Sequence, residues 1–380
     1  MRILLVTPAP RGARTGNRVT ALRWARILRG LGHRVTLARA YRRQRADLLI
    51  ALHARKSFPS IRAYRRRSPQ APLVVALTGT DLYADLRSSA EARRALDLAT
   101  RLVVLQPLAV KALPRRARGK VRVILQSAIA PRSRPGTGEG VFQACVLGHL
   151  RSVKDPFRTA AAARLLPPSS AVRIVHAGAA VEPGMAARAR AEQRRNPRYR
   201  WLGSRPPAEA RKLLARSRLL CLTSKLEGGA NVISEAAAAG VPVLSSRIDG
   251  SVGLLGSRYP GYFPVGGTRA LAALLGRAET DRRFYARLRR GVRALAPRVR
   301  PGRERAAWAS LLAELRPARA GASSPEPRAH PLGERGRVAR RMTEGVVARR
   351  ESFPGAGRAG SGTLCGFLGR RVRPTRWRCG

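Results

Sequence analysis

Acidic residues and long apolar runs are scarce in this chain of 380 residues. Asp and Glu together number 21 against 76 Lys and Arg, so the formal net charge is +55. No apolar run approaches the ~20 residues that a membrane-spanning helix needs. Residues 1–6 already read as an apolar strand and do not show the pattern of a signal peptide. We therefore expect a cytoplasmic protein with no transmembrane segment.

Cysteine is rare as well. The four cysteines, Cys145, Cys221, Cys365 and Cys379, show no spacing typical of metal ligands. Cys145 and Cys221 fall inside apolar runs that predict buried strands, so we interpret both as thiols of a hydrophobic core. We expect no metal site and no bound cofactor.

The excess of positive charge by itself favours nucleic acid or an anionic membrane as a partner. Arginine far outnumbers lysine, however, and Ala, Gly and Pro are abundant along the whole chain. This joint skew indicates a compositional bias of the coding DNA. Basic residues also occur on every predicted helix and not along one face. We expect no specific nucleic-acid partner, only non-specific binding of phosphate at low salt.

Apolar strands alternate with helical patterns, which is typical of an α/β protein with doubly wound parallel sheets. The first predicted sheet has about six strands, at 2–7, 34–38, 47–52, 73–77, 102–105 and 121–125. A stretch rich in Pro, Gly, Ser and Arg at 129–140 predicts a linker. The strands predicted after it are at 142–147, 172–177, 200–202, 218–222 and 241–245.

These patterns divide the chain into four predicted parts. They are an N-terminal Rossmann-like domain at 1–135, a C-terminal Rossmann-like domain at 136–300, a helix at 301–316 and a tail at 317–380. Trp308, Leu311 and Leu312 lie on one side of the predicted helix. The tail is rich in Pro, Gly, Arg and Ser and has no apolar period, so we expect it to be disordered.

The most informative stretch, from Leu222 to Leu244, predicts a strand, a Gly-rich turn, a short helix and a second strand. The turn and the helix start direct backbone N–H groups at one point, where a phosphate group of a ligand binds. Glu227 and Glu235 flank that point, eight residues apart. One carboxylate can face hydroxyl groups of the ligand and the other a second polar edge. A nucleotide sugar has this arrangement of groups.

A second anion pocket is predicted after the first strand. A loop with Arg11 and Arg14 leads to a helix start at Gly16, Asn17 and Arg18, which supplies free N–H groups and positive charge. His53, Thr78 and Asp81 follow other strands of that sheet, at the carboxyl edge where ligands bind in open α/β folds. A turn or helix-cap role explains His53 and Asp81 equally well.

The Glu-x7-Glu pattern before Gly-Val-Pro-Val resembles the donor site of retaining GT-B glycosyltransferases of the GT4-like group. Residues 148–156 and 261–272 resemble further segments of that group. The resemblance implies two Rossmann-like domains facing a cleft and a last helix that crosses back to the first domain. It implies that Glu235 binds the ribose of a uridine nucleotide and that Glu227 faces the sugar.

The same resemblance implies how the donor diphosphate is held. Lys154 and Arg151 supply positive charge, and the backbone of the turn supplies N–H groups, at Gly228, Gly229, Ala230, Asn231 and Val232. The arginine of the family's Gly-Arg-Leu segment is His149 here, so either His149 or Arg151 meets the phosphate. No DxD-like carboxylate pair is present, so the resemblance implies a reaction without a metal ion.

Four runs, at 7–25, 51–55, 76–83 and 250–256, resemble more narrowly the selenosugar synthases of selenoneine biosynthesis. Those enzymes join a UDP-linked N-acetylhexosamine or related sugar to selenophosphate. The resemblance implies a UDP-sugar and selenophosphate as substrates. The implied acceptor-binding residues are Gly16, Asn17, Arg18, Arg11, Arg14, Thr78 and Asp81. Two alternatives stay open: a GT4-like transferase with a lipid or saccharide acceptor, and a polyanion-binding protein on a transferase fold.

Overall fold

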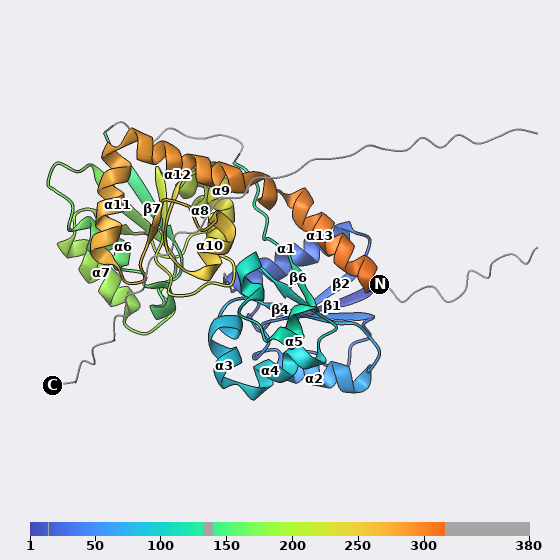
Figure 1. The fold of residues 1–380 in the computed structure, drawn as a ribbon. Helices are drawn as coiled ribbons and strands as arrows, with labels where there is room; N and C mark the ends of the chain where they lie inside the picture. Colours follow the sequence, from blue (N-terminus) through green and yellow to red (C-terminus); the bar gives the residue numbers. More distant parts are fainter. Residues whose placement is uncertain (14, 132–139, 316–380) are drawn as a thin grey trace, which may run out of the picture. The chain divides into compact units, whose positions relative to one another are not determined.

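The computed structural model describes residues 1–13, 15–131 and 140–315 (Figure 1). These residues all belong to one compact unit. The predicted tail, Arg14, Cys365, Cys379 and most of the predicted linker lie outside the described residues. Within the described ranges, no helix is long and apolar enough to cross a membrane.

The first sheet has six parallel strands in the order β2-β1-β3-β4-β5-β6. The strands are β1 (Arg2–Val6), β2 (Arg34–Ala38), β3 (Leu48–Leu52), β4 (Leu73–Leu77), β5 (Arg101–Val104) and β6 (Val121–Val123). The helices are α1 (Gly16–Gly30), α2 (Phe58–Arg67), α3 (Leu86–Ser88), α4 (Ala90–Leu98) and α5 (Arg115–Arg118). β3 and β4 are buried along their whole length, because helices pack on both faces of the sheet.

The second sheet also has six parallel strands, in the order β12-β11-β10-β7-β8-β9. The strands are β7 (Phe142–Leu147), β8 (Val172–Ala177), β9 (Tyr199–Trp201), β10 (Leu219–Leu222), β11 (Val243–Ser246) and β12 (Tyr262–Phe263). The helices are α6 (Arg158–Ala163), α7 (Met185–Arg195), α8 (Pro207–Arg216), α9 (Asn231–Ala239), α10 (Asp249–Leu255), α11 (Thr268–Thr280) and α12 (Arg282–Leu295).

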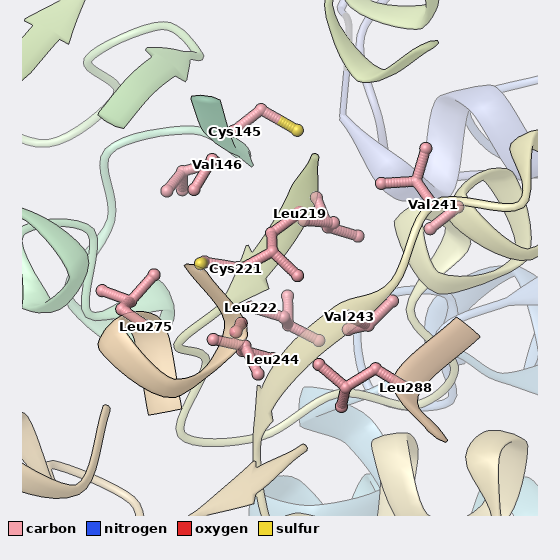
Figure 2. Packing of buried hydrophobic residues seen from close by; sticks show 14 of the residues in the cluster. Cys145, Val146, Leu219, Cys221, Leu222, Val241, Val243, Leu244, Leu275 and Leu288 are labelled. Atoms are coloured by element: carbon pink, nitrogen blue, oxygen red, sulfur yellow. The ribbon is translucent and has the colours of Figure 1, made fainter. Parts of the chain in front are cut away.

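Cys145 and Cys221 lie in the core of the second sheet, among side chains such as Leu219 and Leu244 (Figure 2). Both thiols are free and buried. Burial raises the pKa of Cys145 to about 12 and raises the pKa of Cys221 further. The prediction that both are core thiols is therefore confirmed.

The last described helix, α13 (Pro301–Glu314), packs against α1 and the first sheet (Figure 1). The rings of Trp24 and Trp308 meet edge to face, with centroids 4.8 Å apart. Glu304 is buried beside them and accepts hydrogen bonds from the indole of Trp24 at 2.8 Å and the backbone N–H of Ser127 at 2.9 Å. Arg23 balances its charge at 3.1 Å, as a buried carboxylate requires.

The predicted fold class, two doubly wound parallel sheets, is confirmed. β2, β4, β7 and β8 have the predicted bounds, and the other predicted strands differ by one or two residues at an end. α10 and β12 are among the elements that were not predicted. β12 pairs over only two residues, and α10 carries two glycines, so neither has a recognisable period.

The strand order of each sheet reverses at one point, between β1 and β3 in the first sheet and between β7 and β10 in the second. Ligands of open α/β sheets bind at such a point, outside the carboxyl ends of the strands. The segments that follow these four strands begin at Thr7, His53, Gly148 and Thr223. They hold most of the predicted site residues.

Candidate active site

A cavity of about 500 Å³ lies where segments of the two sheets meet; we call it the large cavity. The first sheet contributes the start of α1 and Thr78, and the second contributes the turn before α9. The predicted site residues that line it are Gly16, Asn17, Arg18, Thr78, His149, Lys154, Glu227, Gly229, Ala230, Asn231, Val232 and Glu235. The structure thus brings together most of the residues predicted for donor and acceptor.

A second cavity of about 320 Å³, the small cavity, shares part of this lining, including Asn17, Lys154 and Glu227. It adds residues that the large cavity lacks, among them His53, Lys56, Thr80 and Arg151. Of the described residues that line it, Lys56, Arg151 and Lys154 are cationic and Glu227 is the single acid. An anion is therefore the ligand that its charge favours.

Lys154 and Glu227 form an ion pair that borders both cavities. Lys154 ends a short helical turn after β7, and the hydroxyl of Thr223 donates to its carbonyl at 2.9 Å. The hydroxyl of Ser224 donates to the Glu227 carboxylate at 2.7 Å. The loops after β7 and β10 are thus tied together where the two charges meet.

Glu235 lies on α9, just over one turn from its start, and lines the large cavity. Burial raises the pKa of its carboxyl group, while Arg211 and Arg23 act in the opposite direction. We expect a carboxylate in this place to gain from a ligand hydroxyl that donates to it, because burial has removed part of its contact with water.

Gly228 and Gly229 allow the segments of the two sheets to approach closely. A Cβ atom on Gly228 would lie 2.5 Å from the carbonyl oxygen of Thr78, and one on Gly229 would lie 2.5 Å from Cβ of Leu105. Gly228 lines neither cavity, unlike the rest of the predicted donor turn. It brings the turn into place instead of facing a ligand.

Asp81 does not face either cavity, contrary to its predicted acceptor-binding role. It is fully buried, and its carboxylate accepts hydrogen bonds from the backbone N–H groups of Ala54 at 3.0 Å, Thr78 at 2.9 Å and Gly79 at 2.8 Å. A carboxylate occupied by three N–H donors holds the loops after β3 and β4 in place. Asp81 is therefore a positioning residue.

His53 lines the small cavity, with its Nε2 3.1 Å from the hydroxyl oxygen of Thr80. Its backbone has a positive φ of 72°, which is uncommon outside glycine and marks a constrained turn after β3. Burial lowers the pKa of the imidazole, which favours the neutral ring.

The remaining predicted cations differ in placement. Arg11 is exposed and lines neither cavity, and Arg14 lies outside the described residues. His149 borders both cavities, and its Nδ1 accepts from the backbone N–H of Ala179 at 3.1 Å. Arg151 borders only the small cavity, where its Nε lies 3.8 Å from the carboxylate of Glu182.

Sequence reasoning missed Lys56, Arg23 and the site role of Gln126. Lys56 comes four residues after β3, so the rule that ligands bind beyond strand ends could have found it. Arg23 carries no such signal, because it is one of many arginines on predicted helices. In the described part of the chain, no three His, Cys, Asp or Glu side chains are grouped so as to hold a metal ion.

The part of the chain that holds the second sheet is similar to a known protein family. Residues 131–294 match the family described as glycosyl transferases group 1. No curated protein matches the chain.

Solved glycosyltransferase structures share the fold of both sheets. HepE of Anabaena, solved with UDP and glucose, has 18% sequence identity and a TM-score of 0.68, over 83% of this chain and 100% of HepE. Sucrose-phosphate synthase of Thermosynechococcus elongatus has 15% identity and a TM-score of 0.62, over 83% of this chain and 98% of its own. The pneumococcal O-GlcNAc transferase GtfA, solved with UDP and GlcNAc, has 14% identity and a TM-score of 0.57, over 70% and 56%. The chain therefore has the GT-B fold.

Proposed function

We propose that this protein is a glycosyltransferase that takes its sugar from a UDP-sugar. The observation that carries the proposal is the convergence of Glu235, Glu227, Lys154 and the start of α9 on the large cavity. Glu235 accepts hydrogen bonds from the ribose hydroxyls, and the N–H groups at the start of α9 bind the diphosphate. HepE and GtfA, which share the fold, were solved with UDP, which supports the same nucleotide here.

In the proposed reaction the bond between the anomeric carbon and the diphosphate oxygen breaks, and UDP leaves with the electron pair. Negative charge then develops on the diphosphate. Lys154 and the dipole of α9 stabilise that charge. No metal ion takes part in this proposal.

We further propose that the acceptor is selenophosphate, bound in the small cavity. Lys56, Arg151 and the N–H groups at the start of α1 bind its phosphate oxygens. Its selenium forms a bond to the anomeric carbon as UDP leaves, and water then cleaves the Se–P bond to give the selenosugar and phosphate. The surplus of cations over acids in that cavity supports an anionic acceptor.

The test incubates the full chain with UDP-N-acetylglucosamine or UDP-glucose, each with selenophosphate, inorganic phosphate or water alone. Release of UDP and a selenium-containing sugar, detected by mass spectrometry, supports both proposals. UDP release that selenophosphate does not stimulate overturns the acceptor assignment and leaves the conventional transferase reading. Absence of UDP binding by calorimetry overturns the donor assignment.

A further inference from the structure

The side-chain amide of Asn231 is held in one orientation by residues of the first sheet. Asn231 is the first residue of α9 and lines the large cavity. Its Oδ1 accepts a hydrogen bond from Nη2 of Arg23 at 3.1 Å. Arg23 lies on α1, far away in the sequence.

Gln126, which follows β6, supplies the second donor. In the orientation that pairs both ends of its amide, its nitrogen donates to Oδ1 of Asn231 at 2.8 Å and to the carbonyl of Gly229 at 3.0 Å. Its oxygen accepts from Nη2 of Arg23 at 3.0 Å and also from the hydroxyl of Thr20. Oδ1 of Asn231 therefore uses both of its lone pairs, and rotation of the amide by half a turn would place N–H against two donors.

The buried carboxylate of Glu304 fixes Arg23 in turn. Nε of Arg23 lies 3.1 Å from Glu304, which is almost inaccessible to solvent. A guanidinium has a rigid planar fork, so one bond through Nε to Glu304 sets the direction of Nη2 toward Asn231. A carboxylate on α13 thus determines which end of the Asn231 amide is directed away from α1.

We propose that Glu304, Arg23 and Gln126 orient Asn231 so that its Nδ2 faces the large cavity and donates a hydrogen bond to a phosphate oxygen of the nucleotide. This inference rests on the proposed UDP-sugar donor. Arg23, Gln126 and Glu304 are positioning residues, and Asn231 is a binding residue. The side chain of Asn231 thereby adds a donor to the backbone N–H groups of the turn.

The test compares Asn231→Asp with Asn231→Ala by calorimetry with UDP and with uridine. Asp keeps the shape and can still accept from Arg23 and Gln126, but it places a negative oxygen where Nδ2 faces the diphosphate. We expect the Kd for UDP to rise about tenfold in the Ala variant and about a hundredfold in the Asp variant. The Kd for uridine, which lacks phosphate, should change less than about twofold in both.

A purely structural role of Asn231 predicts the opposite order. An Asp at the first position of a helix is favourable. The Asn231→Asp variant would then have a melting temperature and a UDP affinity equal to or higher than those of the Asn231→Ala variant. That order overturns the inference. A wild-type chain that does not bind UDP overturns the proposed function instead, so the two failures are distinguishable.

The positioning role is tested by Arg23→Met, with Arg26→Met as the matched control. Arg26 is an exposed arginine on the same helix and lines neither cavity. We expect Arg23→Met to raise the Kd for UDP about fivefold and to leave uridine binding unchanged, because the amide of Asn231 is then oriented by Gln126 alone. Equal effects of the two variants on UDP binding would show that Arg23 contributes only its positive charge, and would overturn its role in positioning Asn231.

Discussion

Lys154 and Glu227 form an ion pair on the border between the two cavities, and the hydroxyl of Ser224 donates to the same carboxylate. The pair joins the loops that follow β7 and β10, the two strands at which the order of the second sheet reverses. In the proposed reaction, the donor diphosphate competes with Glu227 for the same ammonium group. We therefore expect Lys154 to respond to the charge that develops on the diphosphate.

Replacing Lys154 by Met should lower kcat for sugar transfer about a hundredfold and change the Kd for UDP-sugar by less than about fivefold. The ammonium group matters most when the diphosphate carries its full charge, and in the free protein Glu227 neutralises it. Steady-state kinetics and calorimetry measure the two quantities. Lys225→Met is the matched control, since Lys225 is an exposed lysine in the loop after β10 and lines neither cavity. An effect on Kd alone would contradict the prediction.

Glu235 predicts a pH dependence of nucleoside binding. Its pKa is raised above the ordinary value of 4.5 by burial, so the protonated form persists to a higher pH than in a free glutamate. Ribose hydroxyls bind best to the ionised carboxylate, so the affinity for uridine should increase as the pH rises through the raised pKa. Uridine is the probe because it has no phosphate that titrates between about pH 5 and about pH 8.

The Glu235→Gln variant supplies the control for that prediction. It should bind uridine at least about tenfold more weakly near pH 8, with no rise in affinity over the same range. The free energy of unfolding should change with pH in the opposite direction to the uridine affinity. The raised pKa stabilises the folded chain below the ordinary 4.5, and this contribution is lost as the pH rises through the folded value. A wild-type affinity that falls with pH would disprove the assignment.

The sequence predicted the fold class and the donor turn because both depend on local pattern. The alanine-rich run after the glycine turn predicted the short helix α9, and Gly240 ends that helix at a positive φ of 63°. The roles of Asp81 and Arg23 could not be predicted from local sequence pattern. Asp81 is defined by three N–H donors from two loops, and Arg23 by contacts with Asn231 and Glu304 more than 200 residues away. Such contacts exist only after the chain has folded.

Gly228→Ala tests whether close approach of the two segments is needed. The added Cβ would lie 2.5 Å from the backbone of Thr78, which cannot move as a flexible side chain can. We expect a loss of about 2 kcal/mol or more in the free energy of unfolding and a large fall in activity. Thermal and denaturant unfolding measure the first quantity.

Gly276→Ala is the control for that substitution. Gly276 lies inside α11, where a Cβ would meet its nearest neighbour at an ordinary 3.6 Å. Alanine there should stabilise the protein by about 0.5–1 kcal/mol, since glycine is unfavourable inside a helix. Equal changes in the free energy of unfolding of the two variants would show that a side chain at Gly228 can be accommodated beside the backbone of Thr78.

Variants of Lys56 and Arg18 can tell the two cavities apart, because Lys56 borders only the small cavity and Arg18 borders only the large one. If selenophosphate binds in the small cavity, Lys56→Met should raise its KM about tenfold and leave the Kd for UDP unchanged. Arg18→Ala should have the smaller effect on that KM, because Arg18 does not border the small cavity. Hydrolysis of the UDP-sugar by water should persist in both variants, since neither touches the predicted donor contacts.

Lys111→Met, at an exposed lysine away from both cavities, controls for loss of charge. A larger effect of Arg18→Ala would move the acceptor into the large cavity beside the donor turn, and normal kinetics in both variants would argue for a neutral acceptor.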